Sequence, residues 1–142
     1  MARKSSHALP KMALVVHPDM GVLSNFQAAL GEKGFVTIVA RDLPTALLAI
    51  TQHYFEVAVV SSRLAEGGDG WPLAGVLHLV FPSAFVAVIE PSEPDVLTLQ
   101  SAINYGVREI YQQSAPPHDI VSSLVSQLQG STKSETRKPS VQ

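Results

Sequence analysis

The sequence predicts an α/β fold, a parallel sheet with helices on both faces, and three observations support this prediction. Short, continuous apolar runs rich in β-branched residues alternate with longer segments whose apolar residues recur at helical spacing. Turn and capping residues separate these segments. The pair of strand and helix repeats five times along the chain. Because right-handed crossovers place the helices on the two faces of a parallel sheet, this order predicts a sheet between two helical layers.

Five segments are expected to be strands. The first, MALVV at 12–16, is a continuous apolar run, which is typical of a strand buried on both faces. The others are FVTIVA at 35–40, VAVV at 57–60, AFVAVI at 84–89 and a short polar strand around Ile110 and Tyr111.

Capping and turn residues mark where the first two helices are expected to begin or end. Asp19 is expected to cap a helix over 20–33, which Gly34 ends. Asp42 and Pro44 open a second helix. The inner face of this second helix is expected to carry Ala46, Leu47 and Ile50.

The next two helices follow loops. The glycine-rich loop AEGGDG at 65–70 precedes a helix over 71–79. Ser92 and Asp95 resemble a capping box and are expected to start a fourth helix, which runs to Tyr105.

The last helix is expected to begin at Asp119 and to end near Gln129, where Gly130 follows as a stop signal. It carries two neighbouring apolar stripes, Ile120, Leu124 and Leu128 in one and Val121 and Val125 in the other. The first stripe suffices to cover a sheet. The second fits either a well-buried terminal helix or a surface for association.

The composition is that of one globular domain. The 142 residues are 46% hydrophobic and 15% charged, which gives enough apolar material for a core. The absence of cysteine excludes disulfides, thiolate zinc sites and cysteine nucleophiles. No apolar run approaches the roughly 20 residues of a membrane span, and no secretory signal precedes Pro10. We therefore expect a cytoplasmic protein without membrane contact.

The charge is unevenly distributed. The net charge of −2 divides into +3 over residues 1–11, −7 over 12–130 and +2 over 131–142. A nucleic-acid-binding domain needs a dense basic face, and the acidic body excludes this class. The charge pattern and composition predict a flexible N-terminal extension over 1–11, a domain over 12–130, and a disordered tail or linker over 131–142.

Five segments match a known family in order and spacing: VVHPD (15–19), ALGEKGF (29–35), ARDLPTALLAI (40–50), EVAVVSS (56–62) and INYGVREIYQQ (103–113). With them, residues 11–130 resemble the receiver domain of two-component response regulators. The resemblance implies a three-layer α/β/α sandwich of the CheY-like, flavodoxin-like kind. Its five parallel strands would take the order 2-1-3-4-5. It also implies a bacterial phosphorelay context.

The resemblance also implies where a phosphorylation site would lie. In receivers, two acids after the first strand and an aspartate after the third hold Mg²⁺, and the aspartate accepts the phosphoryl group. A threonine or serine after the fourth strand and a lysine after the fifth then bind that group. The matching residues of this chain are His17 and Pro18, Ser61, Glu90 and Gln113, and all five depart from the pattern.

Each departure removes a chemical capability. Proline has no side-chain oxygen, and a neutral imidazole is a poor partner for Mg²⁺. Ser61 has no carboxylate for an acyl phosphate, Glu90 repels a phosphoryl group, and Gln113 brings no positive charge. Asp19 is expected to act as a helix cap and not as a ligand. We therefore expect no metal and no cofactor at this site, and a contact between His17 and Glu90 in its place.

In receivers, the fourth helix, the fifth strand and the last helix commonly mediate association. The resemblance therefore implies a protein partner or a homodimer at this face. Ile110 stands where receivers carry a Tyr or Phe switch residue, so no conformational relay to this face is expected. The candidate interface residues are Val96, Leu99, Ile103, Tyr105, Val121 and Val125.

The preferred interpretation is a non-catalytic pseudo-receiver that signals through protein association. Two alternatives stay open. One is a receiver phosphorylated atypically, at Ser61 or His17. The other is a flavodoxin-like enzyme that binds a nucleotide or flavin at the strand ends, although HPDMG at 17–21 lacks the phosphate-binding loop that such ligands require.

Overall fold

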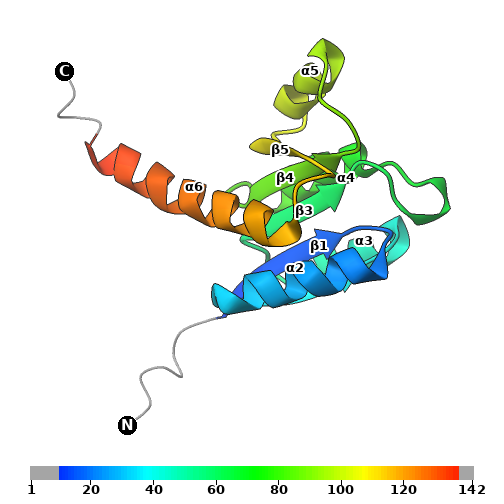
Figure 1. The fold of residues 1–142 in the computed structure, drawn as a ribbon, viewed down its shortest axis with the longest axis horizontal. Coiled ribbons are helices and arrows are strands. Elements are labelled where there is room, and N and C mark those ends of the chain that lie inside the picture. The colour runs from blue at the N-terminus through cyan, green and yellow to red at the C-terminus, as the bar shows by residue number, and fades with distance from the viewer. Residues whose placement is uncertain (1–9, 138–142) are drawn as a thin grey trace, which may run out of the picture.

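The computed structural model describes residues 10–137, and the side chains of residues 10–130 (Figure 1). Five parallel strands form one sheet in the order β2-β1-β3-β4-β5, which confirms the predicted fold class and strand order. The strands are β1 (Lys11–Val16), β2 (Phe35–Ala40), β3 (Val57–Ser61), β4 (Phe85–Glu90) and β5 (Glu109–Gln112). The helices are α2 (Met20–Glu32), α3 (Leu43–Gln52), α4 (Gly70–Val80), α5 (Val96–Asn104) and α6 (Pro117–Arg137), with a short 3₁₀ turn η1 (Ala65–Gly67).

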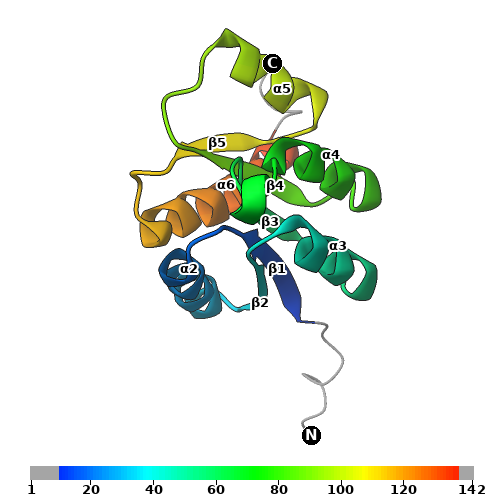
Figure 2. The ribbon, with the colours of Figure 1, turned by 90° about the vertical axis from the view of Figure 1, so that its right-hand side faces the viewer.

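The core lies on both faces of the sheet, since α2 and α6 cover one face and α3 and α4 the other (Figure 2). Alternate side chains of β1 lie on opposite faces of the sheet: Leu14 packs on the side of α3 and α4, and Val15 packs on the side of α2 and α6. Helix α5 is different, because Ala102 is its one buried residue. No helix among residues 10–137 is long and apolar enough to cross a membrane.

Aspartate caps set the helix starts as the sequence predicts. The carboxylates of Asp19, Asp42 and Asp95 accept hydrogen bonds from backbone N–H groups three residues later, at 2.9–3.0 Å. Gly34 follows α2 with a φ of +91°, a conformation that favours glycine. These local signals therefore fix turns between strands and helices.

Leu47 is not on the inner face of α3, where it was expected. Its side chain is 43% exposed, while Ala46, Ala49 and Ile50 are buried. Ala49 and Ile50 lie three and four positions after Ala46 and share its face of the helix, whereas Leu47 lies about 100° around the helix from Ala46 and falls outside that face.

The boundaries of α6 also differ from prediction. The helix begins at Pro117, with Asp119 inside the first turn, and it continues through Gly130 to Arg137. Glycine inside a helix costs only about 1 kcal/mol relative to alanine, so Gly130 does not force a stop. The predicted extension before β1 and the end of the predicted tail fall largely on 1–9 and 138–142, outside the described residues.

Candidate functional site

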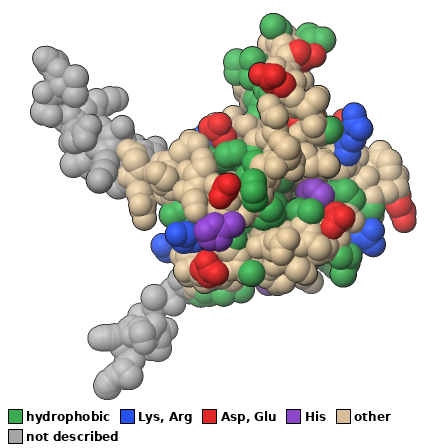
Figure 3. All heavy atoms as spheres, viewed as in Figure 1, with side chains coloured by type: hydrophobic (Ala, Val, Ile, Leu, Met, Phe, Trp, Pro, Cys, Tyr) green, Lys and Arg blue, Asp and Glu red, His purple; other side chains and the backbone are tan. Residues whose placement is uncertain are grey.

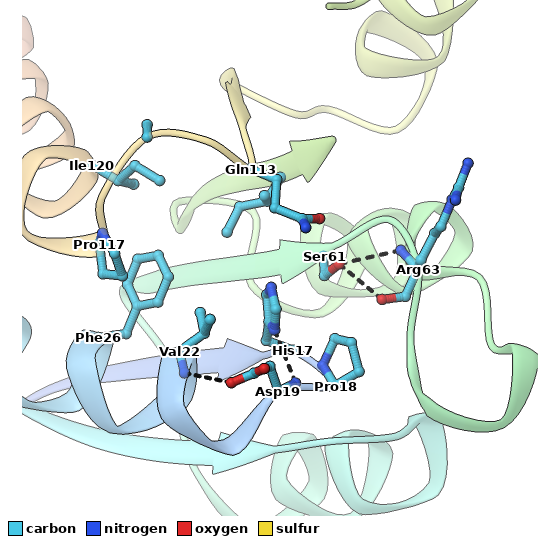
Figure 4. A pocket seen from close by; sticks show the side chains of 12 residues that line it. His17, Pro18, Asp19, Val22, Phe26, Ser61, Arg63, Gln113, Pro117 and Ile120 are labelled. Atoms are coloured by element: carbon cyan, nitrogen blue, oxygen red, sulfur yellow. Dashed lines mark hydrogen bonds between the residues drawn. The ribbon is translucent and has the colours of Figure 1, made fainter. Parts of the chain in front are cut away.

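The carboxyl ends of the strands meet at one edge of the sheet and surround a cavity of about 510 Å³ (Figure 4). His17 follows β1, Ser61 ends β3, Glu90 ends β4 and Gln113 follows β5. Five of the six residues predicted for this site line the cavity: His17, Pro18, Asp19, Ser61 and Gln113. The sixth, Glu90, does not.

His17 is buried and points into the cavity (Figure 4). Its Nδ1 accepts a hydrogen bond from the backbone N–H of Asp19 at 3.1 Å. Burial lowers the pKa of the imidazole, and the negative charge of Asp19 opposes this effect. The neutral ring therefore carries its proton on Nε2, which faces the cavity as a hydrogen-bond donor.

Ser61 is buried and its hydroxyl is engaged locally. The hydroxyl donates to the backbone carbonyl of Arg63 at 2.8 Å and accepts from the Arg63 N–H at 3.3 Å. The first residue of α4, Gly70, packs directly on this strand end, since a Cβ there would lie 2.0 Å from the Ser61 carbonyl oxygen. The Gly70 N–H also donates to the carbonyl of Ser62 at 2.9 Å. The end of β3 is thus closed by backbone contacts.

Glu90 turns towards α4 instead of towards β1. Its Oε2 accepts a hydrogen bond from Trp71 Nε1 at 2.6 Å. The Trp71 ring in turn lies near that of Tyr105, with centroids 6.3 Å apart. The predicted contact between His17 and Glu90 is therefore wrong. Since β3 lies between β1 and β4 in the sheet, those strands are roughly 9–10 Å apart.

Apolar side chains line the other half of the cavity, and sequence reasoning missed them. They come from α2, from β4, from the loop before α6 and from the first turn of α6: Val22, Phe26, Ile89, Ala115, Pro117 and Ile120. In Figure 4, Phe26, Pro117 and Ile120 lie on one side, while Gln113 and Ser61 lie on the other. The apolar stripe of α6 that contains Ile120 was an available signal, because this helix begins just after the end of β5, at the same edge of the sheet.

The donor set does not suit Mg²⁺, which prefers carboxylate and other oxygen ligands in octahedral geometry. Asp19 is the one carboxylate in the cavity lining, and its Oδ1 already accepts the N–H of Val22 at 3.0 Å. Across the part of the chain whose side chains are described, no three His, Asp or Glu side chains gather in a way that could hold a metal ion.

The candidate interface residues divide into two groups. Val96, Leu99 and Ile103 on α5 are 73%, 49% and 78% exposed. Tyr105 is half-buried against α4, where Gly75 leaves room for its ring. Val121 is only 1% exposed and belongs to the core, and Val125 packs against that core. The second stripe of α6 therefore belongs to the core, and among the candidate interface residues the exposed ones lie on α5.

No protein-family model matches the sequence, and no curated protein matches it significantly. Solved structures do match the fold. A CheY-like response regulator receiver domain protein from Methanospirillum hungatei JF-1 superposes with a TM-score of 0.76 at 18% identity, covering 88% of this chain and 98% of that one. A response regulator from Clostridium difficile superposes with a TM-score of 0.74 at 18% identity, covering 84% and 96%.

A third similar structure carries a modification at its own site. It is a response regulator from Burkholderia pseudomallei with a phosphorylated aspartic acid, a calcium ion and citrate. It superposes with a TM-score of 0.72 at 21% identity, covering 88% of this chain and 74% of that one. The shared strand order, the helix placement and these superpositions identify the fold of this chain as that of CheY-like response regulator receiver domains.

Proposed function

We propose that this chain is a receiver-like signalling module that takes up no phosphoryl group by the aspartyl route and acts by associating with a protein partner or a second copy. It is not an enzyme. The observation that carries the proposal is the chemistry of the strand ends, where a buried serine stands in the acceptor position. The same proposal includes a two-component context and the cytoplasm as compartment.

The state of Ser61 supports the first half of the proposal. An acyl phosphate needs a carboxylate, and a serine hydroxyl needs a base that removes its proton. The Ser61 hydroxyl donates to the Arg63 carbonyl, while the nearby His17 ring carries its own proton on the nitrogen that faces the cavity. The Ser61 hydroxyl is therefore not prepared to accept a phosphoryl group, and His17 is not prepared to remove its proton.

Glu90 supports the same conclusion. At the position where receivers place a hydroxyl that binds the phosphoryl group, this chain has a carboxylate held by Trp71. A carboxylate repels a phosphoryl dianion, and releasing it from Trp71 costs a charge-assisted hydrogen bond. The strand ends therefore lack both the acceptor of a phosphoryl group and the hydroxyl that would bind it.

The surface of α5 supports the second half. Val96, Leu97, Leu99 and Ile103 are exposed, and the helix contains no charged residue between Val96 and Asn104. Figure 3 shows hydrophobic side chains gathered at the end of the molecule where α5 lies. Contiguous apolar surface of this kind marks protein interaction sites.

Sedimentation velocity on the full chain tests association through α5. A second copy as partner predicts a dimer that the substitution Ile103→Glu weakens at least about tenfold, because a buried unpaired charge costs far more than one rim contact. The matched control is Gln100→Glu, which adds the same charge at an exposed polar position of the same helix.

Acetyl phosphate with Mg²⁺ should leave the distribution of species unchanged. If the chain is monomeric, the same two variants are compared for loss of a partner captured from cells. Equal effects of Ile103→Glu and Gln100→Glu, or a dimer that forms only with acetyl phosphate, would contradict the proposal.

A further inference from the structure

We propose that the cavity at the strand ends is a binding site for a small organic carboxylate with an aromatic or branched apolar body. The inference goes beyond association through α5, and it rests on the shape of the cavity and on the chemistry of its two ends. Cavities of about 300–1,000 Å³ with apolar walls and a few convergent polar groups are typical of small-molecule sites. At about 510 Å³ this one falls inside that range.

The apolar end is preformed. Phe26 on α2 and Ile120 on α6 are buried side chains of the core, so their positions are fixed by packing on the sheet. Val22, Ala115 and Pro117 continue the wall towards the opening and are half-buried. A phosphoryl group or a hydrated cation gains nothing from such a wall, whereas an aromatic ring or branched chain gains by leaving water.

The polar end offers donors. His17 presents Nε2–H to the cavity, and the side-chain amide of Gln113 points towards the same space (Figure 4). Neither group has a hydrogen-bond partner there among the side chains and backbone of residues 10–130. Because His17 Nδ1 is occupied by the Asp19 N–H, the ring has no lone pair left for a donor ligand. The ligand must therefore accept hydrogen bonds.

Charge selects a carboxylate among the acceptors. Arg63 lines the edge of the cavity, and its exposed guanidinium forms no ion pair within the described residues. In Figure 4 the side chain extends away from the cavity, so it must change its rotamer to reach an anion bound there. A carboxylate matches a guanidinium and two further donors in size and geometry. The one opposing charge is Asp19, whose carboxylate is turned to the N–H of Val22 at the start of α2. A cationic amine finds no comparable set of acceptors.

Protein-observed NMR on the full chain tests the proposal with named probes. The carboxylate probes are 3-phenylpropionate, 4-phenylbutyrate and 4-methylpentanoate. The matched probes are 4-phenylbutyramide, 4-phenylbutylamine and inorganic phosphate. We expect saturable shifts for residues 17–22, 61–63 and 113–117 with at least one carboxylate probe. The amide, the amine and phosphate should each bind at least about tenfold more weakly, because each lacks either the charge or the apolar body.

Paired substitutions locate the site. Gln113→Glu puts a like charge beside the carboxylate and should weaken binding about tenfold or more. Gln112→Glu makes the same change one residue earlier, at an exposed position that does not line the cavity, and should leave affinity within about twofold. Ala115→Trp fills the apolar end from a half-buried loop position and should abolish binding. Thermal unfolding verifies that each variant is folded.

Four results would overturn the inference. These are no saturable shift with any carboxylate probe, an amide or amine that binds as well as its carboxylate, phosphate that binds as well as 4-phenylbutyrate, and equal losses for Gln113→Glu and Gln112→Glu. The experiment measures occupancy of the cavity alone. It can therefore fail while the proposed association through α5 stands, and the reverse also holds.

Discussion

The imidazole of His17 occupies a strand end where receivers carry a carboxylate, and its surroundings decide what this edge of the sheet offers. Nδ1 is engaged by the backbone of Asp19, so the ring presents a donor and no lone pair to the cavity. The Ser61 hydroxyl donates its hydrogen bond to the Arg63 carbonyl. His17 and Ser61 are thus buried and hydrogen-bonded locally, so this edge of the sheet presents a hydrogen-bond donor where a cation site needs a carboxylate.

The burial of His17 predicts a pH dependence of stability. Its pKa is lowered from 6.5 in the folded chain, mainly by burial. Below pH 6.5 the unfolded chain therefore binds the proton more readily, and stability falls as the pH drops towards the folded-state pKa. The free energy of unfolding should fall with a slope of at most about 1.4 kcal/mol per pH unit from this one group.

Urea denaturation of the wild type and of His17→Asn at several pH values between 7.5 and 5 measures this contribution. Asparagine can accept the Asp19 N–H without titrating, so the variant should lose this part of the slope. His78→Gln, at an exposed histidine, should retain it. A wild-type slope that survives in His17→Asn would show that His17 is not the group responsible.

Gly70 packs too closely on the end of β3 to accept a side chain without strain. A methyl group there meets the Ser61 carbonyl oxygen at 2.0 Å, and backbone on both sides prevents an inexpensive adjustment. We expect Gly70→Ala to lower the free energy of unfolding by about 1–3 kcal/mol. Gly31→Ala, with nothing within 4 Å of the added carbon, should instead raise it by about 0.5–1 kcal/mol. Denaturant titration of both variants checks the pair, and the same sign of change for both would contradict the close packing of α4 on β3.

At the level of elements, the hydrogen bond from Trp71 to Glu90 connects α4 to the end of β4. The bond spans 2.6 Å and joins two elements that backbone hydrogen bonds do not connect directly. Helix α5, in contrast, packs only weakly on the rest of the domain. It buries Ala102 alone and leaves most of its apolar side chains in water. This difference makes α5 the element with most to gain from a partner.

The bond between α4 and β4 can be tested by removing its acceptor. Glu90→Ala leaves the indole N–H of Trp71 without its partner and should cost about 1–3 kcal/mol of unfolding free energy. Trp71 is the one tryptophan of the chain, so its emission spectrum should shift in this variant. Glu93→Ala removes an exposed carboxylate close by and should change neither quantity. Indistinguishable spectra and stabilities for the two variants would contradict the contact.

At the level of the whole molecule, patterns that are local in sequence predicted the fold well. Apolar runs located the first four strands, and the pair Ile110 and Tyr111 located the short polar fifth. Asp19, Asp42 and Asp95 marked three helix starts, because caps and strand patterns depend on neighbouring residues. The strand order came from the resemblance to receivers. What failed was non-local: the partner of Glu90 lies 19 positions earlier in the chain, on a helix that no spacing rule connects to it.

The cavity was predictable only in part for the same reason. Its polar half lies at strand ends, which a parallel sheet brings together whatever the side chains are. Its apolar half depends on how α2 and the start of α6 pack against each other, and the sequence alone indicates only that Phe26 and Ile120 are core residues.

Intact-mass spectrometry after incubation with acetyl phosphate and Mg²⁺ tests whether the strand ends can take up a phosphoryl group. We expect no species heavier by the roughly 80 Da of one phosphoryl group, under conditions that modify an ordinary receiver domain in parallel. An addition of that mass, on an aspartate or on Ser61 or His17, would contradict this expectation.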